Sequence, residues 1–241
     1  MSGHSKWHKI RSQKGATDAK RGAMFTQLSR AITVAAKEKG GDPAMNHQLK
    51  TAIEKAKAGN VPKDNIERAI KKGTGELESE ALEEIVYEGY GPGGSAIIVE
   101  SLTDNRNRTA ADIKHLFSKH GGNLGGSGAV GWMFDRLGVI RIGSDQLSGK
   151  DMDAVELRMI ECGADDVRAD ESGITVLTKM GDLQTVEECV NRAGFASESG
   201  LEYLPKDPVA HDASQHGNLE ELLEALEDNQ DVQSTFTNVV S

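Results

Sequence analysis

The sequence contains no long hydrophobic run. No apolar stretch among its 241 residues approaches the roughly 18 that a membrane-spanning helix needs. The opening residues, MSGHSKW, are polar and basic and lack the apolar core of a secretory signal peptide. These absences argue against a helical membrane protein, and we expect a soluble protein located in the cytoplasm.

Cysteine is also scarce, since only Cys162 and Cys189 are present. They lie far apart in the sequence, within stretches typical of helices, which argues against a disulfide framework or a CxxC metal site. We therefore expect two separate buried thiols. His4 and His8 have no Cys, Asp or Glu close by in the sequence, so we expect no metal and no other cofactor.

Common catalytic motifs are missing, because GxxxxGK[ST], HExxH and GxSxG do not occur. Residues 126–131, GSGAVG, match GxGxxG by letter. They run into a predicted strand at residues 130–134, whereas a dinucleotide site needs glycines that follow a strand and open a helix. We therefore expect neither an enzyme nor a small-molecule substrate.

Charge is distributed unevenly along the chain. The formal net charge is −10, but residues 1–75 carry 16 Lys and Arg against 6 Asp and Glu. The remaining residues carry 12 basic and 32 acidic side chains. A basic end on an acidic body is typical of a protein that binds a polyanion through that end, although solvated helix surface is an alternative.

The basic end is predicted to be helical. Apolar residues at helical spacing indicate helices from Phe25 to near Gly40, from Leu49 to Gly59 and from Pro62 to Gly73. In the first helix, Arg30 and Lys37 fall opposite the apolar face. We expect residues 1–78 to form a basic helical domain with a flexible arm.

The rest of the chain alternates strands with helices, so the predicted fold class is multidomain α+β. Residues 137–206 have the order β-α-β-β-α-β, which is ferredoxin-like. Residues 79–136 and 207–241 contain strands near Ala96 and Val232 that are expected to share one sheet. The ferredoxin-like unit is thus predicted to be an insertion in a discontinuous α+β domain.

The third predicted helix has a basic face. Ile66 and Ile70 fall on one side, with Arg68, Lys71 and Lys72 on the other. Such a stripe suits phosphate contacts, although a solvated helix surface has the same pattern. The candidate nucleic-acid-binding residues of the basic end are Lys6, Trp7, Lys9, Arg11, Lys14, Lys20, Arg21, Lys63, Arg68, Lys71 and Lys72.

The arm at residues 1–15 has no apolar pattern that would hold it on a core. Trp7 lies among cations there, and it can stack on an unpaired base while they hold phosphates. The alternative is that Trp7 packs against the helical domain and anchors the arm.

A second candidate site is the segment LTDNRNRT at residues 102–109. Thr109 is the expected helix N-cap, with Asp112 completing a capping box. Arg106 and Arg108 then lie beside a helix N-terminus, where guanidinium and free N–H groups can bind an anion. The alternative is that Asp104 and the two arginines only fix the loop.

Five blocks, in order and across nearly the whole chain, resemble the YebC/PmpR family. They are SGHSKW (2–7), DAKRG (18–22), PKDNI (62–66), YEGYGPGG (87–94) and LTDNRNRT (102–109). The resemblance implies a helical N-terminal domain, two α+β domains, and neither catalysis nor a cofactor. Members are described as DNA-binding transcriptional regulators or, like the mitochondrial translational activator of cytochrome c oxidase, as translation factors acting on ribosomes, notably at proline-rich stretches.

The expected function is a non-enzymatic regulator of gene expression that binds nucleic acid and no membrane. In a helix-turn-helix, Lys63, Asp64 and Asn65 would face base edges, yet the cations gather at the far end of that helix, where contacts position rather than specify. A flexible arm bearing Trp7 suits folded RNA, such as ribosomal RNA or a bound tRNA. We favour a translation factor, with a regulator of transcription on promoter DNA as the alternative.

Overall fold

The computed structural model describes residues 18–78 and 81–240. They form two compact units, and the smaller one is the continuous segment Phe134–Asp207. The larger unit combines the described residues before and after that segment. The chain therefore leaves the larger unit after Met133 and re-enters it at Pro208.

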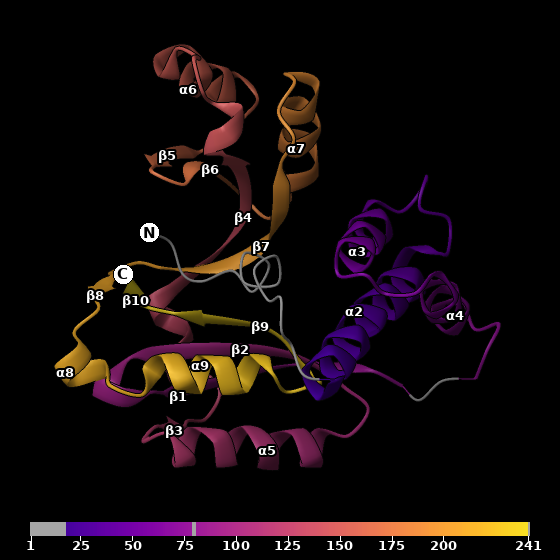
Figure 1. The fold of residues 1–241 in the computed structure, drawn as a ribbon, viewed down its shortest axis with the longest axis vertical. Helices are drawn as coiled ribbons and strands as arrows, with labels where there is room; N and C mark the ends of the chain where they lie inside the picture. Colours follow the sequence, from indigo (N-terminus) through magenta and orange to yellow (C-terminus); the bar gives the residue numbers. More distant parts are fainter. Residues whose placement is uncertain (1–17, 79–80, 241) are drawn as a thin grey trace. The chain divides into compact units, whose positions relative to one another are not determined.

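The basic end folds into the three predicted helices, α2 (Asp18–Lys39), α3 (His47–Ala58) and α4 (Lys63–Gly73). Both α3 and α4 pack against α2 (Figure 1). Their shared core includes Ile32, Leu49, Ile53 and Ile66, so the apolar periodicity located the buried faces correctly.

Two residues fix how these helices meet. The buried Asn46 side chain caps α3 by accepting a hydrogen bond from the Leu49 N–H, while its amide group donates to the carbonyls of Ala35 and Gly40. A Cβ atom at Gly73 would lie 2.4 Å from the carbonyl oxygen of Thr33, so only glycine lets α4 approach α2 this closely.

The sheet of the larger unit has the strand order β3-β1-β2-β9. Its strands are β1 (Glu83–Tyr90), β2 (Ala96–Thr103), β3 (Asn123–Leu124) and β9 (Val232–Thr237). Strand β9 pairs antiparallel with β2, which confirms that the last strand completes the sheet begun near Ala96. One face is covered by α5 (Arg106–Lys119) and α9 (Leu219–Glu227), whose apolar side chains pack on β2 (Figure 1).

Shorter elements complete the larger unit. They are the 3₁₀ helices η1 (Pro92–Gly94) and η2 (Gly131–Met133), helix α8 (Ala213–His216), and the parallel pair β8 (Val209–Ala210) and β10 (Val239–Val240). Because η2 occupies residues 131–133, the strand predicted at residues 130–134 is displaced and starts only at Phe134. Among the helices of the described residues, none combines the length and apolar character needed to cross a bilayer.

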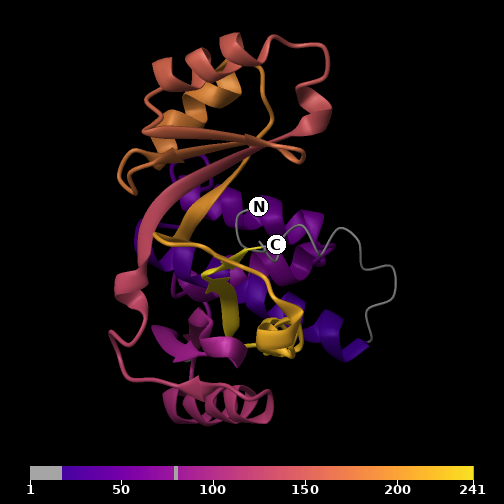
Figure 2. The same cartoon turned by 90° about the vertical axis from the view of Figure 1, so that its left-hand side faces the viewer.

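The smaller unit is ferredoxin-like, as predicted. Its elements in chain order are β4 (Phe134–Gly143), η3 (Ser144–Gln146), α6 (Met152–Glu161), β5 (Asp166–Asp170), β6 (Gly173–Thr178), α7 (Leu183–Arg192) and β7 (Glu198–Pro205). The four strands form an antiparallel sheet in the order β5-β6-β4-β7. Both helices lie on one face of this sheet (Figure 2).

Cys162 and Cys189 form a disulfide in this unit, with their Cα atoms 5.5 Å apart. The prediction of two separate thiols was therefore wrong. The residues are 27 positions apart in sequence, but α6 and α7 pack on the same sheet face and bring the end of one helix to the other. The separation of the two cysteines in sequence did not predict their separation in space, because the packing of α6 and α7 closes the loop between them.

We expect the disulfide to stabilise the smaller unit. Closing a loop of 27 residues restricts the unfolded chain by about 3.5 kcal/mol. The Cys162→Ala/Cys189→Ala variant should lose about that much unfolding free energy in denaturant titrations, and reductant should destabilise only the wild-type chain. Two titratable thiols in the unreduced, unfolded wild-type protein would contradict the assignment.

Candidate nucleic-acid interface

Helix α4 has a buried face and an exposed basic face. Ile66 and Ala69 are buried, whereas Arg68, Lys71 and Lys72 are exposed. Lys71 and Lys72 stand in the last turn, where their charges complement the negative end of the helix dipole. Within residues 18–78 and 81–240 none of these three cations forms an ion pair, so all three can meet an external anion.

The other end of α4 is less basic. Lys63 is exposed and lies 3.5 Å from the Glu67 carboxylate, and Asp64 adds a negative charge to the first turn. The positive charge that is free for phosphates is therefore concentrated at the C-terminal end of α4.

A cavity of about 590 Å³ lies beside the basic face. Its lining includes Phe25 and Arg30 of α2, Asn65, Arg68 and Lys72 of α4, and Asp104 in the turn after β2. The Asn65 side chain is half-buried and forms no hydrogen bond with another residue of the described chain. The cavity thus combines an aromatic ring, an amide and two cations without an ion pair.

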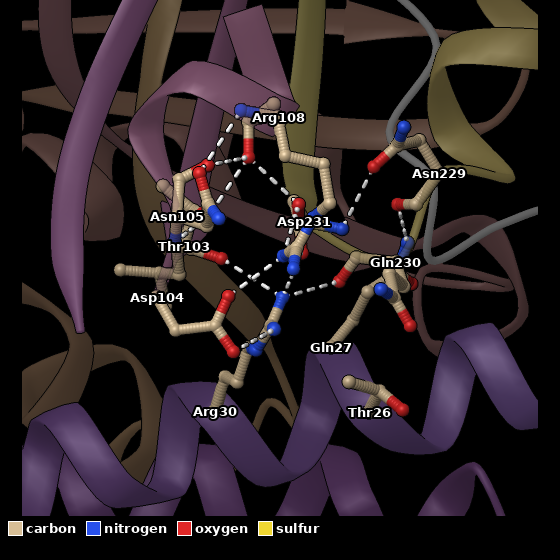
Figure 3. Close-up of polar contacts among 12 residues, drawn as sticks. Thr26, Gln27, Arg30, Thr103, Asp104, Asn105, Arg108, Asn229, Gln230 and Asp231 are labelled. Carbon is tan, nitrogen blue, oxygen red and sulfur yellow. Dashed lines mark hydrogen bonds and ion pairs between the residues drawn. The ribbon is translucent and has the colours of Figure 1, made fainter. Parts of the chain in front are cut away.

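Helix α2 is attached to the α+β part of the larger unit by a polar network around Asp231. The Asp231 carboxylate is only 1% exposed. It forms an ion pair with Arg30 and accepts hydrogen bonds from Arg108 (3.0 Å) and from the Thr109 hydroxyl (2.7 Å). Figure 3 shows Arg30 rising from α2 between Asp104 and Asp231. One buried anion therefore joins α2, α5 and the start of β9.

The electrostatics of this network favour the charged carboxylate. Burial alone would raise the pKa of Asp231, but hydrogen bonds from Arg30, Thr109 and Arg108 outweigh it and hold the pKa below its ordinary value. Arg30 also donates to the backbone carbonyls of Leu102 (3.1 Å) and Gln230 (3.2 Å). Both terminal nitrogens of the guanidinium group are thus hydrogen-bonded within the protein.

The C-terminal end of α9 provides a second attachment for α2. The Gln27 amide donates to the carbonyls of Glu227 (2.9 Å) and Asn229 (2.7 Å), which lie at the end of α9, where helix carbonyls lack partners. Lys20 lies 2.9 Å from Glu224 and 2.7 Å from Asp228, and its pKa is raised by hydrogen bonds to these two carboxylates. The two contacts hold α2 along α9.

The glycine-rich loop at residues 126–131 is an anion-binding loop that is already filled. The Glu88 carboxylate accepts hydrogen bonds from the N–H groups of Gly128 (2.7 Å), Val130 (2.8 Å) and Gly131 (2.6 Å). Burial would raise the pKa of Glu88, but these three bonds together lower it. Since a side chain uses the donors, this loop does not hold a dinucleotide phosphate.

The predicted site residues fall into three groups. Lys6, Trp7, Lys9, Arg11 and Lys14 lie outside the described residues. Lys20, Arg21, Lys63 and Arg108 form ion pairs with carboxylates of the chain itself. Arg68, Lys71, Lys72 and Arg106 are exposed, and none forms an ion pair within the described residues. The structure brings Arg68, Lys71 and Lys72 together on one helix.

The predicted N-cap at Thr109 was wrong. Helix α5 begins at Arg106, and the Asn105 side chain caps it by accepting a hydrogen bond from the Arg108 N–H. Thr109 is buried inside the first turns, with its hydroxyl directed to Thr103 and Asp231. Asn and Thr both favour the N-cap position, so the residue type did not distinguish them. Thr109 bonds instead to the buried Asp231 carboxylate.

Sequence reasoning missed Arg30, Gln27 and Asp231. Arg30 was placed on an outward face of α2, yet its side chain is only 12% exposed. The sequence did contain one indication that α2 has a second contact face, because Lys20, Gln27 and Arg30 recur on one side of α2, away from its apolar face. Their partners, however, lie about 200 positions further along the chain.

Metal binding has no visible basis in the described part of the chain. Residues 18–78 and 81–240 contain no group of three or more His, Cys, Asp and Glu side chains placed to hold an ion. The described residues do place three exposed cations of α4 beside a polar cavity.

Fold and site define a class of protein in which basic helices precede two antiparallel sheets, one of them ferredoxin-like. Two family models match the chain. The TACO1/YebC protein N-terminal domain matches residues 5–76, and the TACO1/YebC second and third domain matches residues 82–239. The chain belongs to the TACO1/YebC family.

Relatives are similar over their full lengths. A probable transcriptional regulatory protein of Persephonella marina is 52% identical, covering 99% of this chain and 95% of the relative. One of Thermoanaerobacter pseudethanolicus is 48% identical, covering 99% and 97%. The crystal structure of a conserved hypothetical protein from Aquifex aeolicus matches with a TM-score of 0.83 at 41% identity, covering 98% and 97%. The two relatives from Persephonella marina and Thermoanaerobacter pseudethanolicus are thus named as regulatory proteins.

Removing the Asp231 charge should weaken the fold strongly. In Asp231→Asn, Arg30 and Arg108 lose a buried partner, and breaking such a pair typically costs about 3–5 kcal/mol. The matched control is Asp228→Asn, because its half-exposed ion pair with Lys20 contributes at most about 1 kcal/mol. Denaturant unfolding at neutral pH measures both losses, and equal losses would contradict the role assigned to Asp231.

The difference in unfolding free energy between wild type and Asp231→Asn should depend on pH. Because the pKa of folded Asp231 is lowered, its stabilisation is fully present above the unfolded value of about 3.9. It is lost as the pH falls through the folded pKa. The difference between wild type and Asp231→Asn should therefore shrink below about pH 4.

Proposed function

We propose that the chain is a non-enzymatic regulator of gene expression that binds nucleic acid through the exposed face of α4. The observation that carries the proposal is the group of Arg68, Lys71 and Lys72, which are exposed cations without ion pairs in the described residues. The backbone phosphates of a nucleic acid are the expected partners of such a group of cations.

The charge distribution supports binding by this end alone. The whole chain is acidic, with a formal net charge of −10, so most of its surface repels a polyanion. Lys6, Lys9, Arg11 and Lys14, which lie outside the described residues, stay candidates for further phosphate contacts. Arg106 adds an exposed cation at the start of α5, while Arg108 is shared with Asp104 and Asp231.

We further propose that the target is RNA on the ribosome, ribosomal RNA or a bound tRNA, and that the protein relieves stalling at proline-rich stretches. A base-reading helix uses its N-terminal residues in the major groove. In α4 that end carries Asp64 and a Lys63 that already lies beside Glu67. Cations at the opposite end contact a backbone without reading sequence, which suits the recognition of folded RNA by shape.

A DNA-binding transcriptional regulator is the second candidate. The relatives from Persephonella marina and Thermoanaerobacter pseudethanolicus carry the name probable transcriptional regulatory protein. The short connection between α3 and α4, residues 59–62, also has the length of a helix-turn-helix turn.

Binding should be electrostatic and centred on the end of α4. Lys71→Gln/Lys72→Gln should lower the slope of log K against log salt by roughly 1.5, the value for two lost phosphate contacts. The control is Lys114→Gln/Lys119→Gln, which removes two exposed cations from α5 instead. An unchanged slope in the α4 variant, or the same decrease in both, would disprove the assignment.

The two targets can be separated directly. We expect the protein to co-sediment with ribosomes at physiological salt, and Lys71→Gln/Lys72→Gln to reduce that association. Footprinting on promoter DNA with excess non-specific competitor should give no protected sequence. A reproducible promoter footprint together with no ribosome association would favour the transcriptional alternative.

A further inference from the structure

We propose that the cavity between α2 and α4 accepts a single unstacked nucleotide of the bound RNA strand. The inference rests on the proposed function and extends it from phosphate contacts to a base-binding site. Its volume, about 590 Å³, lies in the range in which protein pockets enclose small ligands.

The cavity offers the contacts that an unstacked base needs. Phe25 lines it from α2 and is only half-buried, so part of its ring remains for stacking. Base–aromatic stacking is the usual way in which proteins hold unpaired bases, and it works for every base. Phe25 therefore supplies affinity without selectivity.

Asn65 supplies a polar contact for the base. It lines the same cavity from the first turns of α4, and its amide has no hydrogen-bond partner among the residues described. An amide presents a donor and an acceptor side by side, so it can form two hydrogen bonds with the polar edge of an unstacked base, as it does with the N6 and N7 atoms of adenine. The Asn65 side chain thus adds a hydrogen-bonding contact to the base that stacks on Phe25.

The nucleotide's phosphate has partners on the same helix. Arg68 and Lys72 stand one turn apart on α4, and both line the cavity. Arg30 also lines it, but Asp231 and Asp104 already hold its guanidinium group. The Asp104 carboxylate, which also lines the cavity, forms ion pairs with Arg30 and Arg108. Among the described residues, Glu78 is then the one lining carboxylate that forms no ion pair.

Because Arg68 and Lys72 are exposed, the cavity suits a nucleotide within a strand better than a free nucleotide. Both side chains are exposed at the cavity, and the exposed Lys71 lies next to them on α4. A strand can therefore continue along the basic face while one base turns inward. The proposed site is therefore one position along a bound strand, where one base enters the cavity and the neighbouring phosphates contact the exposed cations.

The inference is tested with single-stranded RNA decamers of adenine, uracil and cytosine. The wild-type chain should bind all three decamers, and Asn65→Ala should weaken each of them several-fold because the bound base loses a hydrogen-bonding partner. Phe25→Leu, which retains an apolar side chain for the helix core, should weaken all three decamers, and its melting temperature reports whether the fold is kept.

A matched pair of lysines separates the cavity from general electrostatics. Lys72 lines the cavity and Lys71 does not, so Lys72→Gln should weaken binding several-fold more than Lys71→Gln. Equal losses in the two lysine variants, together with unchanged decamer binding in Asn65→Ala and Phe25→Leu, would overturn the cavity while leaving the proposed nucleic-acid binding intact. Failure of the wild-type chain to bind any decamer or ribosome would overturn both.

Discussion

A buried carboxylate is stable only when cations and hydrogen-bond donors surround it, and Asp231 obtains these from two different helices. Arg30 comes from α2, whereas Arg108 and Thr109 come from α5. The carboxylate is 1% exposed, so none of these partners can be replaced by water. Any conformation of the larger unit that separates α2 from α5 leaves charges buried and unpaired.

The candidate interface depends on this constraint. Asn46 and Gly73 fix α3 and α4 against α2, and Arg30 fixes α2 against the sheet of the larger unit. Helix α4 therefore presents Arg68, Lys71 and Lys72 from a position that is fixed within the larger unit. The same Arg30 forms part of the cavity wall, so the network that holds α2 also shapes the proposed nucleotide site.

Local pattern predicted much of the architecture. Apolar spacing located α2, α3 and α4, and the order of strands and helices identified the ferredoxin-like unit. The basic face of α4 could be predicted as well, because Arg68, Lys71 and Lys72 belong to one short helix whose buried face was clear. The boundaries of three separate domains stay a prediction.

Features that join distant parts of the chain could not be predicted in this way. Arg30 looks like a surface residue until its partner, about 200 positions away, is known. The cavity needs Phe25 and Asn65 in one lining, and the disulfide needs α6 and α7 on one sheet face. Periodicity describes a single helix, whereas these features depend on how helices pack together.

A double-mutant cycle between Arg30 and Asp231 tests the dependence on the buried carboxylate most directly. The variants are Arg30→Met, which keeps the apolar stem, Asp231→Asn and the two combined, each measured by denaturant unfolding at neutral pH. If the pair holds α2 on the sheet, the coupling free energy should be about 2–3 kcal/mol. Losses that add to within about 0.5 kcal/mol would show that the two residues act independently and would contradict the account.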